Sequence, residues 1–259
     1  VPFHAWTPDV YQGSPSPATA FMAGASKAAG FAALLRVFYT TFGILRVDWI
    51  PLVWVLAVLS LVVGGVLAVV QTDVKRMLAY SSIVHAGYIL IGLHSANILG
   101  LTGALFYVFA YTFMVMGSFA VVTIVGRKGD AQHDLDAYRG LYRNRPALAV
   151  AFTILLMAQT GVPFTSGFWA KFNVIAAAVD SESYALAIVA MLVAVVTAFF
   201  YLRIILLMFS APGDDAKIAR LPVPFAAALA VGITVAVTLV IGFAPDTLMS
   251  VARDALPAF

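Results

Sequence analysis

Three ionisable side chains fall inside long apolar stretches of the sequence: Lys27, His85 and Lys171. An ionisable group inside a membrane is energetically costly, so each of the three is a candidate functional residue. Burial disfavours the charged form of a lysine and a neighbouring charge changes that balance, so a buried lysine can take up and release a proton. Histidine titrates near neutral pH and can pass a proton between its two ring nitrogens. Together these residues predict a proton relay near the middle of a membrane.

Hydroxyl groups beside His85 could fill gaps in such a relay. Tyr80, Ser81 and Ser82 precede His85 by about one helical turn. Two structural interpretations stay open. His85 could only hydrogen-bond between helices, and the two lysines could only bridge helices. No carboxylate lies deep in an apolar stretch, so the lysines have no evident counter-ion within the chain.

The composition identifies the class of protein that must position these residues. The 259 residues are 63% hydrophobic and 10% charged, against about 45–50% and about 25% in soluble domains. A soluble enzyme and a disordered chain are therefore excluded. The absence of cysteine excludes a disulfide scaffold, a thiolate metal site and a catalytic thiol. The sequence has no phosphate-binding loop, no dinucleotide fingerprint and no metal-ligand spacing of histidines. The net charge of +3 indicates basic cytoplasmic loops rather than a nucleic-acid partner.

Seven apolar stretches are long enough to cross about 30 Å of hydrocarbon. Their continuous apolar character favours helices over the alternating strands of a barrel. The sequence therefore predicts an all-α, polytopic transmembrane bundle that forms a single domain over residues 1–259. The expected spans are roughly 17–43, 51–70, 77–94, 99–125, 147–179, 184–209 and 223–244.

The fifth expected span contains a break near 160–168. Gly161, Pro163 and Gly167 fall in its middle, where glycine weakens a helix and proline removes a backbone donor. Non-helical backbone at membrane depth is tolerated only within protein or beside a water-filled cavity. Broken helices of this kind recur in ion transporters. A simple proline kink is the alternative interpretation.

The distribution of Lys and Arg predicts the orientation of the chain. Cytoplasmic loops carry the excess of these residues, and nine lie on one side against two on the other. The nine are Lys75, Arg76, Arg127, Lys128, Arg139, Arg143, Arg145, Lys217 and Arg220, and the two are Arg46 and Arg253. Loops 71–76, 126–146 and 210–222 are therefore expected in the cytoplasm and the C-terminus outside. Loop 126–146 is either a solvated connector or a docking segment. Arg36 and Arg203 lie near helix ends, where their side chains can reach the membrane surface.

Several motifs in the sequence resemble one known family. They are VPFHAWTPDVYQGSPSPATAF, ASKAAGFAALLRVF, QTDVKRMLAYSSIVHAGYILIGL and GVPFTSGFWAKF, and they are spread over most of the chain. They resemble the proton-translocating, antiporter-like membrane subunits of respiratory complex I. The continuation TPDVYQGSP resembles the subunit N branch of that family in particular. Members have about fourteen spans built from two inverted repeats, so this chain is expected to be the second half of a longer protein.

The resemblance implies roles for the same three residues. Lys27 matches the lysine of the eighth helix, His85 matches the histidine that connects the relay, and Lys171 matches the terminal lysine of the broken twelfth helix. The glutamate and the other lysine of the family's relay belong to its first half, upstream of Val1. NADH, FMN, iron–sulfur clusters and quinone would be held by other subunits, with no cofactor in this chain. The implied partners are the other membrane subunits of complex I, including neighbouring antiporter-like subunits, in the lipid of a bacterial inner membrane.

Two other functions remain open at this point. The chain could be a subunit of a multi-subunit cation/proton antiporter, which uses the same scaffold without electron transfer. Alternatively, it could be a membrane scaffold that transports nothing.

Overall fold

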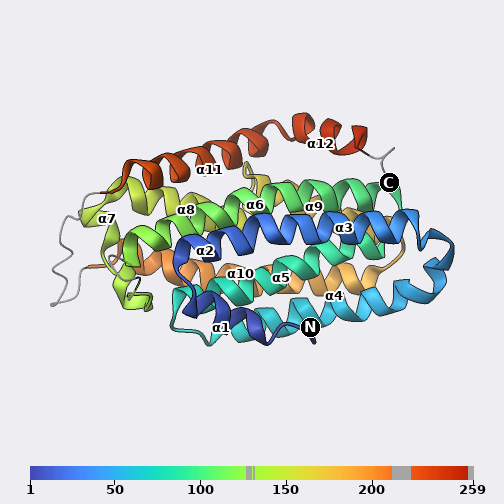
Figure 1. The fold of residues 1–259 in the computed structure, drawn as a ribbon, viewed down its shortest axis with the longest axis horizontal. Coiled ribbons are helices and arrows are strands. Elements are labelled where there is room, and N and C mark those ends of the chain that lie inside the picture. The colour runs from blue at the N-terminus through green and yellow to red at the C-terminus, as the bar shows by residue number, and fades with distance from the viewer. Residues whose placement is uncertain (127–129, 131, 212–222, 256–259) are drawn as a thin grey trace.

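The computed structural model describes residues 1–126, 130, 132–211 and 223–255 (Figure 1). Within this part of the chain the secondary structure is helical, and the only β-type pairing is one isolated bridge between Asp73 and Asp134. The all-α prediction is confirmed.

Long helices run roughly parallel to one another along the molecule (Figure 1). They are α2 (Ser16–Phe21), which continues through a π-helical segment (Met22–Ser26) into α3 (Lys27–Thr40), then α4 (Arg46–Val69), α5 (Val74–His94), α6 (Ile98–Gly126), α10 (Tyr184–Phe209) and α11 (Phe225–Phe243). The shorter helices are α1 (Trp6–Gly13), α7 (Leu141–Asn144), α8 (Pro146–Thr160), α9 (Ser166–Asp180) and α12 (Pro245–Asp254).

Among the described residues, six helical segments are long and apolar enough to cross a membrane. The fifth expected span, 147–179, is confirmed as a broken one. It consists of α8 and α9, each 15 residues long. Such a helix is about 22 Å long, which is shorter than the hydrocarbon layer of about 30 Å. The two halves can therefore cross it only as a pair.

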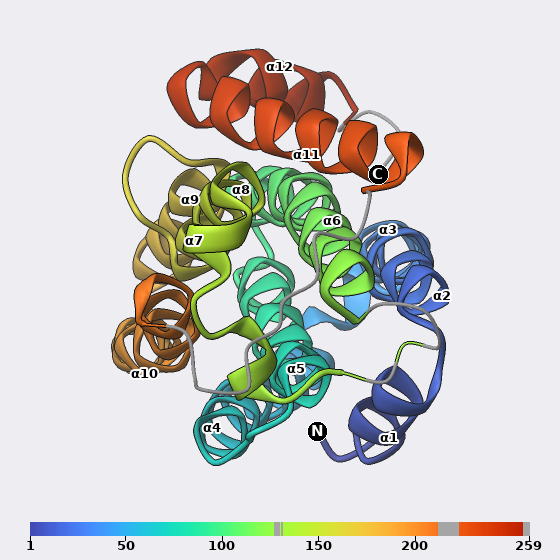
Figure 2. The same cartoon turned by 90° about the vertical axis from the view of Figure 1, so that its left-hand side faces the viewer.

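Helix α5 lies near the middle of the bundle, with α4, α6, α9 and α10 around it (Figure 2). Small residues bring α4 and α5 close together. A Cβ on Gly87 would lie 2.9 Å from Leu61, and one on Gly64 would lie 2.9 Å from Val84. Close approach at small residues is how helices associate in membranes, where apolar surface alone gives no driving force. Side chains of α5 are consequently removed from lipid on most sides.

One correction concerns α4, which begins at Arg46 rather than near residue 51. Pro51, the sixth residue of this helix, removes one backbone hydrogen bond without ending the helix. Asp48 lies in the first turn, where a negative charge is favourable. Arg46 is therefore the first residue of a helix instead of part of a loop.

The two ends of the bundle differ in how they are closed. At one end the backbone N–H of Val74 bonds the carbonyl of His133, Leu135 bonds Thr72, and Gly140 bonds Leu207. The region expected as loop 126–146 thus packs onto the bundle where the structure describes it. At the other end, Asn97 donates to Asp180 at 2.8 Å.

Candidate functional site: a Lys–His–Lys row

The π-helical segment Met22–Ser26 sets the direction of Lys27, the first residue of α3. A π-type turn shifts the register of a helix and is frequent at functional sites. Gly24 within it lies so close to α6 that an added Cβ would approach Met116 Cγ at 2.6 Å. Lys27 then reaches α5, where its ammonium donates to the carbonyl of Ser82 at 2.7 Å and to the Ser82 hydroxyl. The ammonium also lies 5.2 Å from the centre of the Tyr111 ring.

His85 lies on α5 and is 1% exposed. Its Nδ1 lies 2.8 Å from the Tyr107 hydroxyl on α6, and its Nε2 lies 3.3 Å from the Tyr201 hydroxyl on α10. Both ring nitrogens therefore have a hydrogen-bonding partner, as proton transfer through an imidazole requires. Lys27 and Lys171 both lie near enough for their charges to influence His85.

Lys171 lies on α9 at the point where α8 ends. The last carbonyls of a helix have no partner within it and carry a partial negative charge. Two of those carbonyls, on Met157 and Ala158, accept from the N–H of Gly161. The carbonyl of Thr160 instead accepts from the Lys171 ammonium at 2.8 Å. The break in the helix thus stabilises a buried cation for which the expected span offered no carboxylate.

Glycines make this break possible. Gly161 has φ of +94°, a conformation that residues with a Cβ rarely adopt. Gly167 lies directly against the carbonyl of Ala158, so an added Cβ would overlap that oxygen. The close packing of α9 on the end of α8 brings Lys171 to Thr160.

Several buried residues complete the row, and the sequence did not single them out. Tyr201 on α10 bonds Gln159 on α8 at 3.1 Å and also contacts Ser81. Thr197, one turn before Tyr201, accepts from Lys171 at 3.4 Å. The sequence alone does not indicate these residues, because tyrosine, threonine and glutamine are common in apolar helices. Only the packing of the helices brings them to the lysines and the histidine.

The structure separates the predicted supporting residues into two groups. Ser81 and Ser82 contact Tyr201 and Lys27, and so they belong to the row. Tyr80 is half-buried and lies beside Arg76 instead. Pro163 is exposed in the connection between α8 and α9, so its part is to interrupt the span rather than to contact the row.

The two other basic residues of the spans also differ. Arg36 is exposed on α3. Arg203 is half-buried on α10 and donates to the carbonyls of Val69 and Gln71 at 3.4 and 3.3 Å, near the end of the bundle. Neither residue joins the row.

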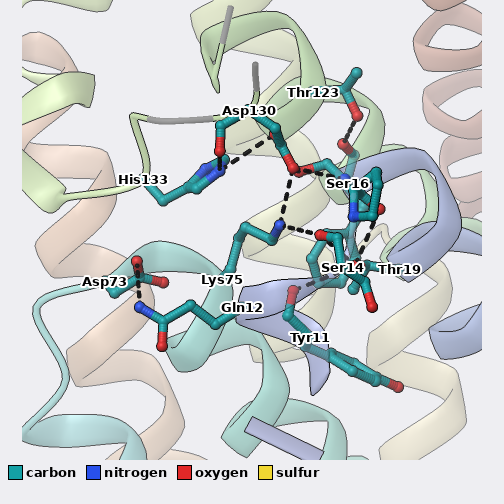
Figure 3. Close-up of polar contacts among 12 residues, drawn as sticks. Tyr11, Gln12, Ser14, Ser16, Thr19, Asp73, Lys75, Thr123, Asp130 and His133 are labelled. Carbon is teal, nitrogen blue, oxygen red and sulfur yellow. Dashed lines mark hydrogen bonds and ion pairs between the residues drawn. The ribbon is translucent and has the colours of Figure 1, made fainter. Parts of the chain in front are cut away.

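A second polar cluster lies at the same end of the bundle as residues 71–76 (Figure 3). The sequence placed Lys75 in a loop, but α5 begins at Val74, so Lys75 lies within the helix and is 1% exposed. Its ammonium contacts Asp130 at 2.9 Å and the carbonyl of Ser14 at 2.5 Å. Asp130 also accepts from the backbone N–H and the hydroxyl of Ser16, at the start of α2.

Asp130 is held in its charged form. Burial alone would raise the pKa of this carboxyl group, but hydrogen bonds from Lys75 and Ser16 outweigh burial and lower the pKa below its usual value. The cluster therefore joins α2, α5 and the segment after α6 through an ion pair.

Two further features concern ligands. Among the residues that the structure describes, no group of three His, Cys, Asp or Glu side chains could hold a metal ion. A cavity of about 490 Å³ opens beside Lys27, and most of its lining is apolar, including Phe31, Leu34 and Ile83.

The fold matches a known class of membrane protein. The family described as "NADH:quinone oxidoreductase/Mrp antiporter, TM" matches residues 1–198. The chain belongs to this family, and it is a multi-pass membrane protein.

Within the family the resemblance to subunit N of NADH-quinone oxidoreductase is confirmed. The chain is 49% identical to the subunit N of Parafrankia sp. (strain EAN1pec) over 258 residues, and this match covers 98% of the chain and 48% of the relative. The subunit N of Rhodococcus opacus (strain B4) is 48% identical, with 100% of the chain and 48% of the relative covered. The chain thus spans about half the length of the curated relatives it matches.

Solved structures of membrane complexes contain chains with the same fold. A chain of respiratory complex I from Thermus thermophilus with bound aureothin is 35% identical with a TM-score of 0.82, covering 96% of this chain and 54% of the other. A chain of the Mrp complex from Dietzia sp. DQ12-45-1b has a TM-score of 0.89 at 23% identity, covering 98% and 55%, and shows that the fold is shared.

Proposed function

We propose that this chain is part of a proton-translocating membrane subunit of an NADH:quinone oxidoreductase. It would relay protons through Lys27, His85 and Lys171, while NADH, FMN, iron–sulfur clusters and quinone are handled by other subunits. The observation that carries the proposal is Lys171 at the broken end of α8, bonded to the carbonyl of Thr160 at 2.8 Å. A buried cation held by a helix end rather than by a carboxylate can lose its proton without leaving an unpaired negative charge behind.

The proposed transfer follows the contacts of the row. Lys27 is held by Ser82, which lies one turn before His85 on α5. His85 connects through Tyr201 to Gln159, the residue that precedes Thr160, and Thr160 holds Lys171. Water and hydroxyl groups would bridge the remaining steps. Each charged group changes the proton affinity of its neighbour, so a charge that arrives at one lysine favours release from the next.

The proposed setting is a bacterial inner membrane, with the basic end of the bundle in the cytoplasm and the C-terminus outside. The structure describes five of the nine basic residues in the count, and all five lie at this end: Lys75, Arg76, Arg139, Arg143 and Arg145. Of these five, Lys75 is fully buried, in an ion pair with Asp130. The proposed partners are the other membrane subunits of the complex, including antiporter-like subunits.

A cation/proton antiporter is the second candidate, because the fold is shared with a chain of an Mrp complex. Identity favours the first proposal: 49% to a subunit N against 23% to the Mrp chain. Acid uptake that depends on Na⁺ and continues without NADH would support the antiporter instead.

The test uses everted membrane vesicles that carry Lys27→Ala in the full-length gene. We expect NADH oxidation and NADH-driven acid uptake to fall together, because the relay loses its entry lysine, while a native gel shows an assembled complex. Arg36→Ala is the matched control, since Arg36 is a basic residue of the same helix that does not join the row. Full activity of Lys27→Ala would exclude Lys27 from the proton path, and loss of assembly in both lysine variants, Lys27→Ala and Lys171→Ala, would support a scaffold.

A further inference from the structure

A continuous chain of hydrogen bonds links the backbone of α6 to His85. The Ser118 hydroxyl lies 2.9 Å from the carbonyl of Met114, and Gln159 Nε2 lies 2.7 Å from the Ser118 oxygen. Gln159 Oε1 lies 3.1 Å from the Tyr201 hydroxyl, which in turn lies 3.3 Å from His85 Nε2. Ser118, Gln159, Tyr201 and His85 are each no more than 1% exposed, so bulk water cannot exchange with these bonds.

The direction of each hydrogen bond in this series follows from the number of protons that each group can donate. The carbonyl of Met114 can only accept, so Ser118 donates its single proton there. The Ser118 oxygen must then accept from the Gln159 amide, which turns the NH₂ group toward Ser118. The other half of the amide, Oε1, therefore faces Tyr201 and can only accept, so Tyr201 donates its proton to Gln159.

The same count determines which nitrogen of His85 carries the proton. Tyr201 has no second proton, so toward His85 its oxygen is an acceptor, and Nε2 must donate to it. In the neutral ring Nδ1 is then unprotonated and accepts from the Tyr107 hydroxyl at 2.8 Å. The Ser81 hydroxyl, which also contacts Tyr201, likewise donates to it.

We propose that Gln159, oriented by Ser118, is a positioning residue that holds His85 in its Nε2–H form. The proposal rests on the proposed function, because the tautomer matters only if His85 relays protons. In this form the ring can take up a proton only at Nδ1, on the Tyr107 side, and the imidazolium that forms still donates its Nε2 proton to Tyr201. When the ring gives up one of its two protons, the fixed amide of Gln159 favours the form that keeps the proton on Nε2.

The position of Gln159 extends this role to the broken helix. Gln159 acts on His85 through Tyr201, and the adjacent Thr160 accepts from Lys171. A displacement of the end of α8 therefore changes the surroundings of His85 and of Lys171 together. The charged or titratable groups that face His85 are Lys27 from α3, Lys171 from α9, Tyr107 and Tyr111 from α6, Tyr88 from its own helix, and Tyr201 from α10.

The test compares Gln159→Leu with the wild type in the full-length protein, within the assembled complex. Without the Gln159 oxygen, Tyr201 is free to donate to His85 Nε2. That bond stabilises the neutral ring and is not open to the imidazolium, so protonation of His85 requires more acid. We expect NADH-driven acid uptake to fall on the order of tenfold, since a wrong histidine tautomer is costly in enzymes generally, and its pH optimum to move to lower pH. A variant that merely loosens packing would lower the rate without moving the optimum.

Ser118 provides the second, smaller change. Ser118→Ala lets the Gln159 amide turn over and should move the pH optimum in the same direction, whereas Ser118→Thr keeps the hydroxyl and should behave like the wild type. An unchanged pH optimum in Gln159→Leu or, where that variant fails to assemble, in Ser118→Ala overturns the proposal. The His85→Ala variant distinguishes a failure of the proposed relay from a failure of the role proposed for Gln159. If His85→Ala retains full acid uptake, the proposed relay itself is wrong. If His85→Ala loses acid uptake while Gln159→Leu keeps the wild-type rate and pH optimum, only the role of Gln159 is wrong.

Discussion

At the scale of single residues, the structure meets the cost of buried charge in two different ways. Lys171 is bonded to the free carbonyl of a helix end, and Lys27 to a carbonyl and a hydroxyl of α5. Lys75 instead has a carboxylate partner, Asp130. A lysine paired with a carboxylate keeps its proton, whereas a lysine held by neutral dipoles can exist in either form. We therefore interpret Lys75 as a residue that stabilises the fold, and we keep Lys27 and Lys171 as the lysines of the proposed relay.

A prediction at this scale concerns Asp130. Asp130→Asn removes the negative charge beside the buried Lys75 ammonium, and we expect a loss of about 2 kcal/mol of stability. It would be measured as a lower melting temperature of the purified complex. The double variant Lys75→Met/Asp130→Asn should recover part of the loss, because no buried charge is then left unpaired.

The pH dependence of this contribution follows from the lowered pKa of Asp130. A carboxyl group with a depressed pKa in the folded protein contributes its full stability above its unfolded pKa, and the contribution disappears as the pH falls through the folded pKa. The difference between wild type and Asp130→Asn should therefore stay constant from pH 7 down to about pH 5. A difference that shrinks between pH 7 and pH 6 would contradict the ion pair.

At the scale of elements, the interruption between α8 and α9 is the feature that organises the site. One continuous helix over the same residues would satisfy its own carbonyls and leave none for Lys171. The break instead exposes the carbonyl of Thr160, brings Gln159 to Tyr201 and needs a left-handed backbone at Gly161. Helix α9, on the other side of the break, is also held in place, because the Trp169 indole N–H donates to the carbonyl of Gly242 on α11 at 3.0 Å.

The element-scale prediction is that Gly161→Ala impairs coupled activity. An alanine at φ of +94° is strained by on the order of 1 kcal/mol, and its Cβ would lie 3.0 Å from Lys171 Cδ. Both effects displace Lys171 from Thr160, so NADH-driven acid uptake should fall severalfold. Gly232→Ala is the matched control, because a Cβ there meets nothing within 4 Å in α11 and should leave uptake unchanged. Equal effects of the two variants would contradict the role of the break.

At the scale of the whole molecule, the two ends of the bundle differ in charge and in packing. Among the residues that the structure describes, most Lys and Arg outside the row lie at the end that contains residues 71–76 and α7. This end is held together by the Lys75–Asp130 pair and by backbone hydrogen bonds that involve His133 and Leu135. The opposite end holds the turn between α3 and α4 and the Asn97–Asp180 bond. Positive residues on cytoplasmic segments orient membrane proteins, so this asymmetry predicts which end faces the cytoplasm.

Cysteine labelling can check this orientation, because these 259 residues include no cysteine. Thr72 and Thr41 are both exposed and lie at opposite ends of the bundle. In a cysteine-free full-length protein, a membrane-impermeant maleimide should label Thr72→Cys only in everted vesicles and Thr41→Cys only in right-side-out ones. The reverse pattern would invert the proposed topology.

The amino-acid sequence alone was enough to predict the class of the protein, the places of its spans and the interruption near 160–168. These properties depend on local composition: a helix in lipid needs a long apolar run, and glycine and proline interrupt it wherever the chain folds. The candidates Lys27, His85 and Lys171 could be found in the same way, because a charge in an apolar run is visible without a structure. Their proposed roles in proton transfer stay predictions that the variants above test.

The surroundings of these residues, in contrast, could not be predicted without the folded structure. Lys75 looked like a loop charge until α5 was seen to begin at Val74 and Asp130 to pack against it. Gln159 and Tyr201 are 42 positions apart in the chain, and their importance comes from the contact between their two helices. Such contacts depend on how helices pack, through small residues and close backbone approach, and no local pattern in one sequence specifies them. For the same reason, the direction of the hydrogen bonds that reach His85 became evident only from the folded bundle.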